Sequence, residues 1–179
     1  MPTTFGNTNV EVESVDYDNA DMKHVMRAQL TEDGSVTKLR AYLGNTQTGH
    51  QACYVKGLIY NDKAGPLPDA LLDTSAATAL ADNKAAGWTD LTFSTPVALA
   101  AGYYWIGIIF DELSAGVTWP RKLGGATFPR YFNADDYTDG PTNPFGSGSN
   151  TNVDWSIYAT YSATSTGFTG LTVTRLLQG

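Results

Sequence analysis

Residues 96–110 read PVALAAGYYWIGIIF and form the most apolar stretch of the chain. Val97 and Leu99 precede a turn signal at Ala101-Gly102, and aromatic and β-branched residues follow it. Such side chains pack well on a pleated sheet, so the stretch predicts two strands joined by a tight turn. Because residues 103–110 are apolar at almost every position, we expect them to form a central strand.

Further strand-like runs, separated by turn residues, extend in both directions from this stretch. Residues 88–93 alternate, with Thr89, Leu91 and Phe93 on one face. Residues 35–43 change face near Thr37-Lys38, which predicts a β-bulge. The remaining expected strands cover residues 10–13, 24–30, 51–60, 71–74, 117–119, 127–132, 155–161 and 168–177. The Asp33-Gly34 pair favours the positive φ angles of a tight hairpin turn.

Residues 70–86 are ambiguous because their alanines could form a short helix. Thr74, Ser75 and Thr78 weaken that interpretation, so we expect a strand at residues 71–74 followed by a loop. Many short strands without helices between them predict an all-β, antiparallel, jelly-roll-like β-sandwich. We expect residues 1–161 to form this domain. Residues 162–179 are expected to be a linker and a C-terminal extension strand, which pairs within the domain or with another subunit.

The charge of the chain excludes several kinds of partner. The net charge is −7, only 16% of the 179 residues are charged, and Lys and Arg are not clustered. An acidic surface disfavours nucleic acids and anionic membranes, so we expect neither as a partner. Met1 to Gly6 lack the basic and apolar parts of a signal peptide, which predicts synthesis in the cytoplasm without secretion by that route.

The residues that usually carry catalysis or bind cofactors are scarce. Cys53, the only cysteine, lies in an apolar run and is expected to be a buried strand residue. His24 is expected on a sheet surface and His50 in a loop, and they lack metal-binding spacing. No nucleophile elbow, phosphate loop or dinucleotide fingerprint occurs. We therefore expect a non-enzymatic protein with no catalytic residues and no cofactor, although a pair of distant carboxylates could still meet in space.

Two acidic loops are weak candidates for calcium. Their carboxylates are Asp16, Asp18 and Asp21 in the first loop, and Asp135, Asp136 and Asp139 in the second. Neither loop has the central glycine and terminal glutamate of a helix-flanked calcium loop. The alternative is a set of turns in which these side chains bond to their own backbone. We expect no metal to be required for folding.

Aromatic residues suggest both a core and a binding surface. Trp88 and Trp105 each begin an alternating run near a turn glycine, so we expect both in the buried core. The loop-rich region 111–152 carries Trp119, Tyr131, Phe132 and Tyr137. These four could form a platform on which a sugar ring stacks, or a small core beneath a long loop.

Several phrases occur together in an order that resembles a known module. They are Phe5-Gly6-Asn7-Thr8, Leu58-Ile59-Tyr60-Asn61-Asp62 with Gly65-Pro66, Gly87-Trp88, Phe93-Ser94-Thr95-Pro96-Val97 with Leu99, Ala101-Gly102-Tyr103-Tyr104-Trp105-Ile106-Gly107, and Ser156-Ile157-Tyr158-Ala159-Thr160-Tyr161. This order resembles a jelly-roll module of tailed-phage virion proteins, which is related to carbohydrate-binding-like sandwiches of secreted bacterial proteins. The resemblance covers about residues 5–161. Its motifs imply a fold far more specifically than an activity.

The segment after Tyr161 departs from that resemblance. An apolar run follows a Ser/Thr/Gly-rich stretch, and its candidate assembly residues are Phe168, Leu171, Val173, Leu176 and Leu177. A terminal strand of this kind suits pairing with the sheet edge of a neighbour.

The resemblance implies a virion structural protein, either a capsid decoration (cement) protein or a tail or fibre component. Its expected partners are other virion proteins and itself, as a trimer or another homo-oligomer, and it would be made in the host cytoplasm. The alternative is a carbohydrate-binding module or a receptor-binding tip that uses the loop aromatics on a surface glycan.

Overall fold

The computed structural model describes residues 3–11, 16–17, 21–46, 48, 53–111, 116–119, 121–123 and 129–164. These residues form strands joined by turns and bends, so the predicted all-β fold is confirmed. The strands are β1 (Thr3–Gly6), β2 (Asp16–Tyr17), β3 (Met22–Leu30), β4 (Gly34–Asn45), β5 (Cys53–Lys63), β6 (Leu67–Thr74), β7 (Thr78–Leu80), β8 (Gly87–Leu99), β9 (Gly102–Phe110), β10 (Val117–Thr118), β11 (Arg121–Leu123), β12 (Pro129–Ala134), β13 (Ser149–Trp155) and β14 (Ile157–Ala163). No helix in this described part of the chain could span a membrane.

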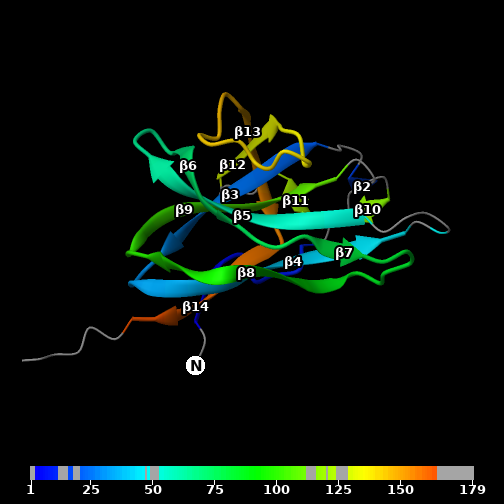
Figure 1. The fold of residues 1–179 in the computed structure, drawn as a ribbon, viewed down its shortest axis with the longest axis horizontal. Helices are drawn as coiled ribbons and strands as arrows, with labels where there is room; N and C mark the ends of the chain where they lie inside the picture. Colours follow the sequence, from blue (N-terminus) through cyan, green and yellow to red (C-terminus); the bar gives the residue numbers. More distant parts are fainter. Residues whose placement is uncertain are drawn as a thin grey trace, which may run out of the picture.

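Two antiparallel sheets pack face to face as a β-sandwich (Figure 1). The six-stranded sheet has the order β1-β14-β4-β10-β2, and β8 pairs with β4. The eight-stranded sheet has the order β11-β13-β12-β3-β9-β5-β6, and β7 pairs with β5. In Figure 1, β4, β8 and β14 form the lower layer, and β3, β5 and β9 lie in the layer above it.

The chain changes sheet at several of its connections. The chain passes from β3 in the eight-stranded sheet to β4 in the other, and then back to β5. The predicted Asp33-Gly34 hairpin is therefore wrong, because β3 and β4 do not pair, and Gly34 begins β4 without a positive φ angle. The connection has to cross the roughly 10 Å between packed sheets, a constraint that a local turn signal does not reveal.

The central strand and its neighbours agree with the sequence analysis. Strand β9 lies between β3 and β5, and Trp105 to Phe110 are buried. The predicted alternation in β8 is confirmed, and the structure shows that the face with Thr89, Leu91 and Phe93 points inward. The predicted bulge is confirmed, because the pairing of β4 with β8 shifts register between Val36 and Lys38.

Some strands differ from the prediction. The first described strand is β1, and of the expected strand at residues 10–13 only residues 10–11 are described, outside any strand. Residues 70–86 contain β6 and β7 and no helix. Strand β13 was not predicted, because its first half, Ser149 to Asn152, is polar and exposed. Strand β13 forms because it pairs with β12 and β11, and a local apolar pattern does not predict this pairing.

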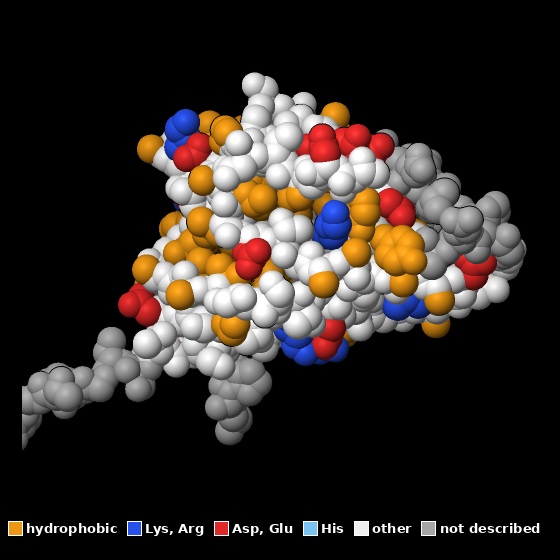
Figure 2. All heavy atoms as spheres, in the orientation of Figure 1, with side chains coloured by type: hydrophobic (Ala, Val, Ile, Leu, Met, Phe, Trp, Pro, Cys, Tyr) orange, Lys and Arg blue, Asp and Glu red, His pale blue; other side chains and the backbone are white. Residues whose placement is uncertain are grey.

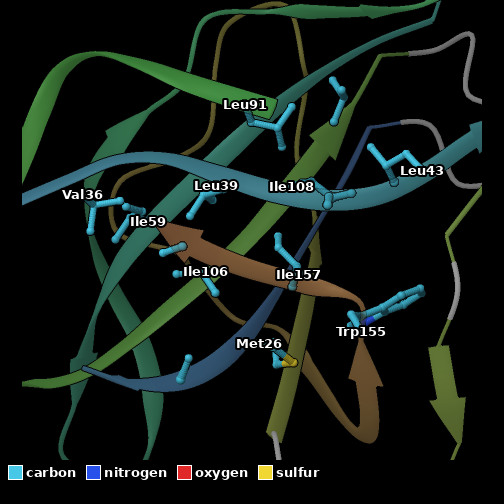
Figure 3. Close-up of a cluster of buried hydrophobic side chains, with 14 of the residues drawn as sticks. Met26, Val36, Leu39, Leu43, Ile59, Leu91, Ile106, Ile108, Trp155 and Ile157 are labelled. Carbon is cyan, nitrogen blue, oxygen red and sulfur yellow. The ribbon is translucent and has the colours of Figure 1, made fainter. Parts of the chain in front are cut away.

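The main core lies between the sheets (Figure 3). Leu39, Leu91 and Ile157 come from the six-stranded sheet, and Ile59 and Ile106 face them from the other. All five side chains are fully buried. Residues of β9 alternate between this core and the opposite face of the eight-stranded sheet.

A second hydrophobic cluster covers the outer face of the eight-stranded sheet. It consists of Val25, Leu58, Tyr60, Trp105, Ile109 and Phe145, and the last of these belongs to the long connection between β12 and β13. This cluster explains why β9 is apolar on both faces. The predicted burial of Trp105 is confirmed, but in this second cluster.

The prediction that Trp88 belongs to the core is wrong. Because β8 turns Leu91 and Phe93 inward, alternation directs Trp88 to the outer face of the six-stranded sheet. There the indole is half-buried, edge-on to the rings of Tyr42 at 5.4 Å and Tyr158 at 4.8 Å.

Strand β14 has a partner on each side, since it pairs with β1 and with β4. Beyond it, the Thr164 backbone N–H donates to the Asp33 carbonyl at 2.8 Å. The predicted assembly residues Phe168, Leu171, Val173, Leu176 and Leu177 lie outside the described residues. The extension strand and the division at residue 161 stay predictions.

Candidate binding site on the eight-stranded sheet

A buried ion pair anchors the connection between β12 and β13. The Lys23 Nζ lies 2.7 Å from the Asp135 Oδ2, and the two side chains are 0% and 2% exposed. Thr142 completes the arrangement, because its backbone N–H donates to the same carboxylate oxygen at 2.8 Å and its hydroxyl accepts from Lys23. Burial lowers the pKa of Lys23, while Asp135 opposes that shift. The Lys23 ammonium also lies 4.4 Å from the centre of the Phe145 ring.

Three hydrogen bonds tie residues 143–145 to strands β6 and β12. The Phe145 N–H donates to the Asp69 carbonyl at 2.8 Å, and the Leu71 N–H donates to the Asn143 side chain at 3.1 Å. The Asn133 amide donates to the Phe145 carbonyl at 2.9 Å. The connection is therefore held on both sides, which gives a rigid wall to the space beside it.

A pocket of about 420 Å³ lies between this wall and the β5–β6 hairpin. We call it the hairpin pocket, and its lining residues are Lys63, Leu67, Pro68, Asp69, Tyr131, Pro144, Gly146, Ser147 and Gly148. Gly146 adopts a φ of 85°, and a Cβ on Gly148 would lie 2.7 Å from the Phe132 carbonyl oxygen. Both positions therefore need glycine for the wall to take this course.

A second group of side chains lies beside the pocket on the same face of the sheet. The Arg27 guanidinium donates two hydrogen bonds to Asp62, at 2.9 and 2.7 Å, and the Trp105 indole N–H donates to Asp62 at 2.7 Å. The Arg27 Cζ lies 3.8 Å from the centre of the Tyr103 ring. The hydrogen bond to Asp62 raises the pKa of Arg27. We call these four residues the Tyr103 platform.

The hairpin pocket and the Tyr103 platform are neighbours. Asp62 of the platform pairs across the β5–β6 ladder with Pro68, which lines the pocket. On the other side, the Tyr131 ring of the pocket lies edge-on to Trp105 of the platform at 5.5 Å. Figure 2 shows hydrophobic side chains exposed on the side of the sandwich where β6 and β8 lie, and no large patch of Lys and Arg on the face drawn.

The four predicted platform aromatics do not form one surface. Trp119 is 1% exposed and stacks on Trp155 in the main core at 4.0 Å, so of the two alternatives for these aromatics its ring packs in a core and is not available to a sugar. Phe132 stacks on His24 at 5.6 Å, on the face of β12 opposite to Tyr131. Tyr137 packs against the second cluster and lies 4.0 Å from the Lys56 ammonium. Of the four, only Tyr131 lines the hairpin pocket.

The sequence analysis missed Arg27, Asp62 and Tyr103 as site residues. One signal was available, because Tyr103 and Trp105 are two positions apart and share a face. The partners Arg27 and Asp62 lie 35 residues apart on two other strands, so their meeting depends on strand order.

Two of the three acidic residues of the second loop, Asp135 and Asp136, bond to protein groups. The Asp135 carboxylate forms the buried ion pair with Lys23 described above. The Asp136 Oδ1 accepts from the Thr138 N–H at 2.8 Å and from its hydroxyl at 2.7 Å, which is a turn of the Asx type and lowers the pKa of Asp136. Asp139 is exposed.

The first acidic loop is described only in part. The Asp21 Oδ1 accepts from the Tyr137 N–H at 3.0 Å, which brings this loop beside the second one. Asp16 lies in β2 with no description of its side chain, and Asp18 lies outside the described residues. No three His, Cys, Asp or Glu side chains within the described ranges are grouped as a metal site.

The two described side chains of the Cys and His type, Cys53 and His24, are buried. Cys53 is 1% exposed, as predicted, and burial raises the pKa of its thiol. The prediction that His24 lies on a sheet surface is wrong, because it is 1% exposed, with its ring stacked on Phe132 and edge-on to Trp155. His50 lies outside the described residues.

Comparison of the chain with protein-family models, curated proteins and solved structures gives no match. The resemblance to phage virion modules therefore stays an expectation drawn from the sequence.

Proposed function

We propose that this chain is a non-enzymatic binding module that takes a carbohydrate in the hairpin pocket and serves a virion as a receptor-binding component. The pocket is the observation that carries the proposal. It combines the Tyr131 ring and two prolines with the polar side chains of Lys63, Asp69 and Ser147.

The chemistry of this lining suits a sugar. A sugar ring has an apolar C–H face that packs on aromatic and proline rings, and hydroxyls that donate to a carboxylate and accept from an ammonium group. The volume of about 420 Å³ lies near the lower end of the range for small-molecule sites, roughly 300–1,000 Å³. Because the wall is tied to β6 and β12, little ordering is needed on binding.

A binding role is favoured over catalysis by the state of the carboxylates around the site. Asp62 is neutralised by Arg27 and Asp135 by Lys23. Both carboxylates also accept hydrogen bonds from neighbouring groups, the Trp105 indole and the Thr142 backbone N–H, and so hold these groups in place.

The substitution Asp69→Ala tests the pocket. Asp69 is the only carboxylate among the lining residues, so its loss is expected to weaken binding about ten- to a hundredfold, the usual value of a hydrogen bond to a charged group. The measurement is titration of the protein with neutral glycans that it retains on a glycan array. Stability should change little, since the Lys63–Asp69 pair is exposed and its atoms are 3.9 Å apart.

Asp73→Ala is the matched control, because Asp73 lies on the same strand outside the pocket lining. If Asp69→Ala and Asp73→Ala bind the glycan with equal affinity, the hairpin pocket is not the glycan-binding site. An array of neutral and acidic glycans that retains none of the wild-type protein would refute the carbohydrate proposal itself.

Virion assembly is a second candidate, and it is compatible with the first. It is supported by the resemblance described above. A second support is that β14, the last described strand, already has a partner on each side, β1 and β4, within the sandwich. The proposed partners are other virion proteins, of the capsid or tail, and further copies of this chain.

Removing residues 166–179 is expected to leave the melting temperature unchanged while reducing the molar mass in solution from that of a homo-oligomer to that of the protomer. Light scattering and a thermal melt make the two measurements. An unfolded product would assign the segment to the protomer's own core. A folded product with unchanged mass and unchanged attachment to particles would exclude the segment from assembly.

A further inference from the structure

We infer that the ligand is an extended oligosaccharide, with one ring in the hairpin pocket and another stacked on Tyr103. This inference rests on the proposed function and adds the length of the ligand and a second binding position. The juxtaposition that carries it is the Tyr103 platform beside the pocket wall.

Tyr103 offers an aromatic face to solvent. Tyr103 is 43% exposed, whereas Trp105 to Phe110 of the same strand are buried. Because Arg27 covers one face of the ring at 3.8 Å, the exposure belongs to the other face and the edge. A ring face that is open and held flat by a stacked guanidinium is a suitable surface for the C–H face of a sugar.

The ring is held in place by buried partners. Arg27 is fixed by its two hydrogen bonds to Asp62, and Asp62 is fixed in turn by the indole of Trp105, which is fully buried. The three side chains come from β3, β5 and β9, adjacent strands of the sheet. A platform of this kind loses little conformational entropy when a ligand binds.

Polar groups surround the exposed ring. Arg27 and Asp62 have side chains that are 22% and 17% exposed, so both reach solvent beside Tyr103. The Arg27 guanidinium has five N–H donors, and its hydrogen bonds to Asp62 use two of them, one on Nε and one on a terminal nitrogen. Gln29, which pairs with Tyr103 across the β3–β9 ladder, is also exposed. Sugar hydroxyls are both donors and acceptors and can bond to all three side chains.

The spacing suits a chain rather than a single ring. Pro68 of the pocket faces Asp62 across one strand pair, and Asn61 faces Tyr104 across the next, which sets Asp62 beside Tyr103. Neighbouring strands are about 4.8 Å apart, so Pro68 on β6 and Tyr103 on β9, with β5 between them, are separated by roughly 10 Å. A single sugar ring cannot occupy both positions, whereas a short oligosaccharide can.

The experiment is a titration with ladders of neutral hexose oligosaccharides, each running from the monosaccharide upward. For a ladder that binds, the wild-type affinity is expected to rise about tenfold with length and then level off once the platform is reached. Tyr103→Ala should abolish this rise. Tyr103→Phe, which keeps the ring, should retain it, and a thermal melt of each variant verifies folding.

Tyr54→Ala is the matched control, because Tyr54 is also 43% exposed and lies at the other end of β5. Asp69→Ala should weaken binding at every length. Suppose that the wild type binds a ladder and that Asp69→Ala weakens this binding. If the affinity of Tyr103→Ala then still rises with oligosaccharide length as that of the wild type does, the extended ligand is refuted and the pocket proposal is retained. If no ladder binds the wild-type protein, the proposed function fails and the extended ligand fails with it.

Discussion

Asp135→Ala should lower the free energy of unfolding by about 3–5 kcal/mol, one of the two largest effects expected for a single substitution in this protein. It leaves the Lys23 ammonium buried with no carboxylate to neutralise it, and breaking a buried ion pair from one side usually has this cost. The same substitution removes the acceptor of the Thr142 N–H and so loosens the connection that walls the hairpin pocket. Urea denaturation measures the first effect, and glycan titration under native conditions measures the second.

The double variant Lys23→Met, Asp135→Leu is the informative control. Replacing both partners of a buried pair by apolar side chains of similar volume is often neutral or stabilising. The double variant should therefore recover most of the stability that Asp135→Ala loses. A loss below about 1 kcal/mol in the single variant would show that water reaches Lys23 and that the pair is not buried in solution.

Trp105→Ala should also cost about 3–5 kcal/mol, the usual range for removing a large buried aromatic. Trp105 is fully buried in the second cluster, so its removal leaves a cavity beneath Tyr131. The substitution also removes one of the three hydrogen bonds to Asp62, which should weaken glycan binding through the Tyr103 platform. Denaturation followed by circular dichroism gives the stability.

Two comparisons separate these contributions. Trp105→Phe keeps an aromatic ring but not the N–H, and is expected to be milder than Trp105→Ala because it leaves a smaller cavity. Trp88→Ala removes an indole that is only half-buried on the opposite sheet, so it should cost less than Trp105→Ala. Equal losses at the two tryptophans would contradict the assignment of Trp105 to a closed cluster.

Features within a single strand could be predicted from the sequence, whereas the sheet that a strand joins could not. The bulge at Thr37 followed from a change of face within one strand, and the place of β9 in the sheet followed from its composition. Both depend on residues next to each other in the chain. The sheet that a strand joins depends on distant partners, which is why Asp33-Gly34 was mistaken for a hairpin and polar β13 was missed.

The candidate site shows the same division. Tyr131 was singled out because an aromatic residue in a loop-rich region suggested a binding surface. Trp119, chosen for the same reason, is in the main core, because burial depends on what lies across the sandwich from a residue. Phe132 and Tyr131 are neighbours in sequence and point to opposite faces of β12, so they could not share one platform.

By itself, the sequence determined the all-β class, the two-sided apolar character of β9 and the alternation of residues 88–93 in β8, because composition and a two-residue period act locally along a strand. Only the tertiary structure decided that Lys23 meets Asp135 across 112 residues, that Arg27 and Trp105 converge on Asp62, and that a pocket opens beside them. These groups come together through strand order in a sheet, and that order is selected by the burial of the whole core rather than by any one segment.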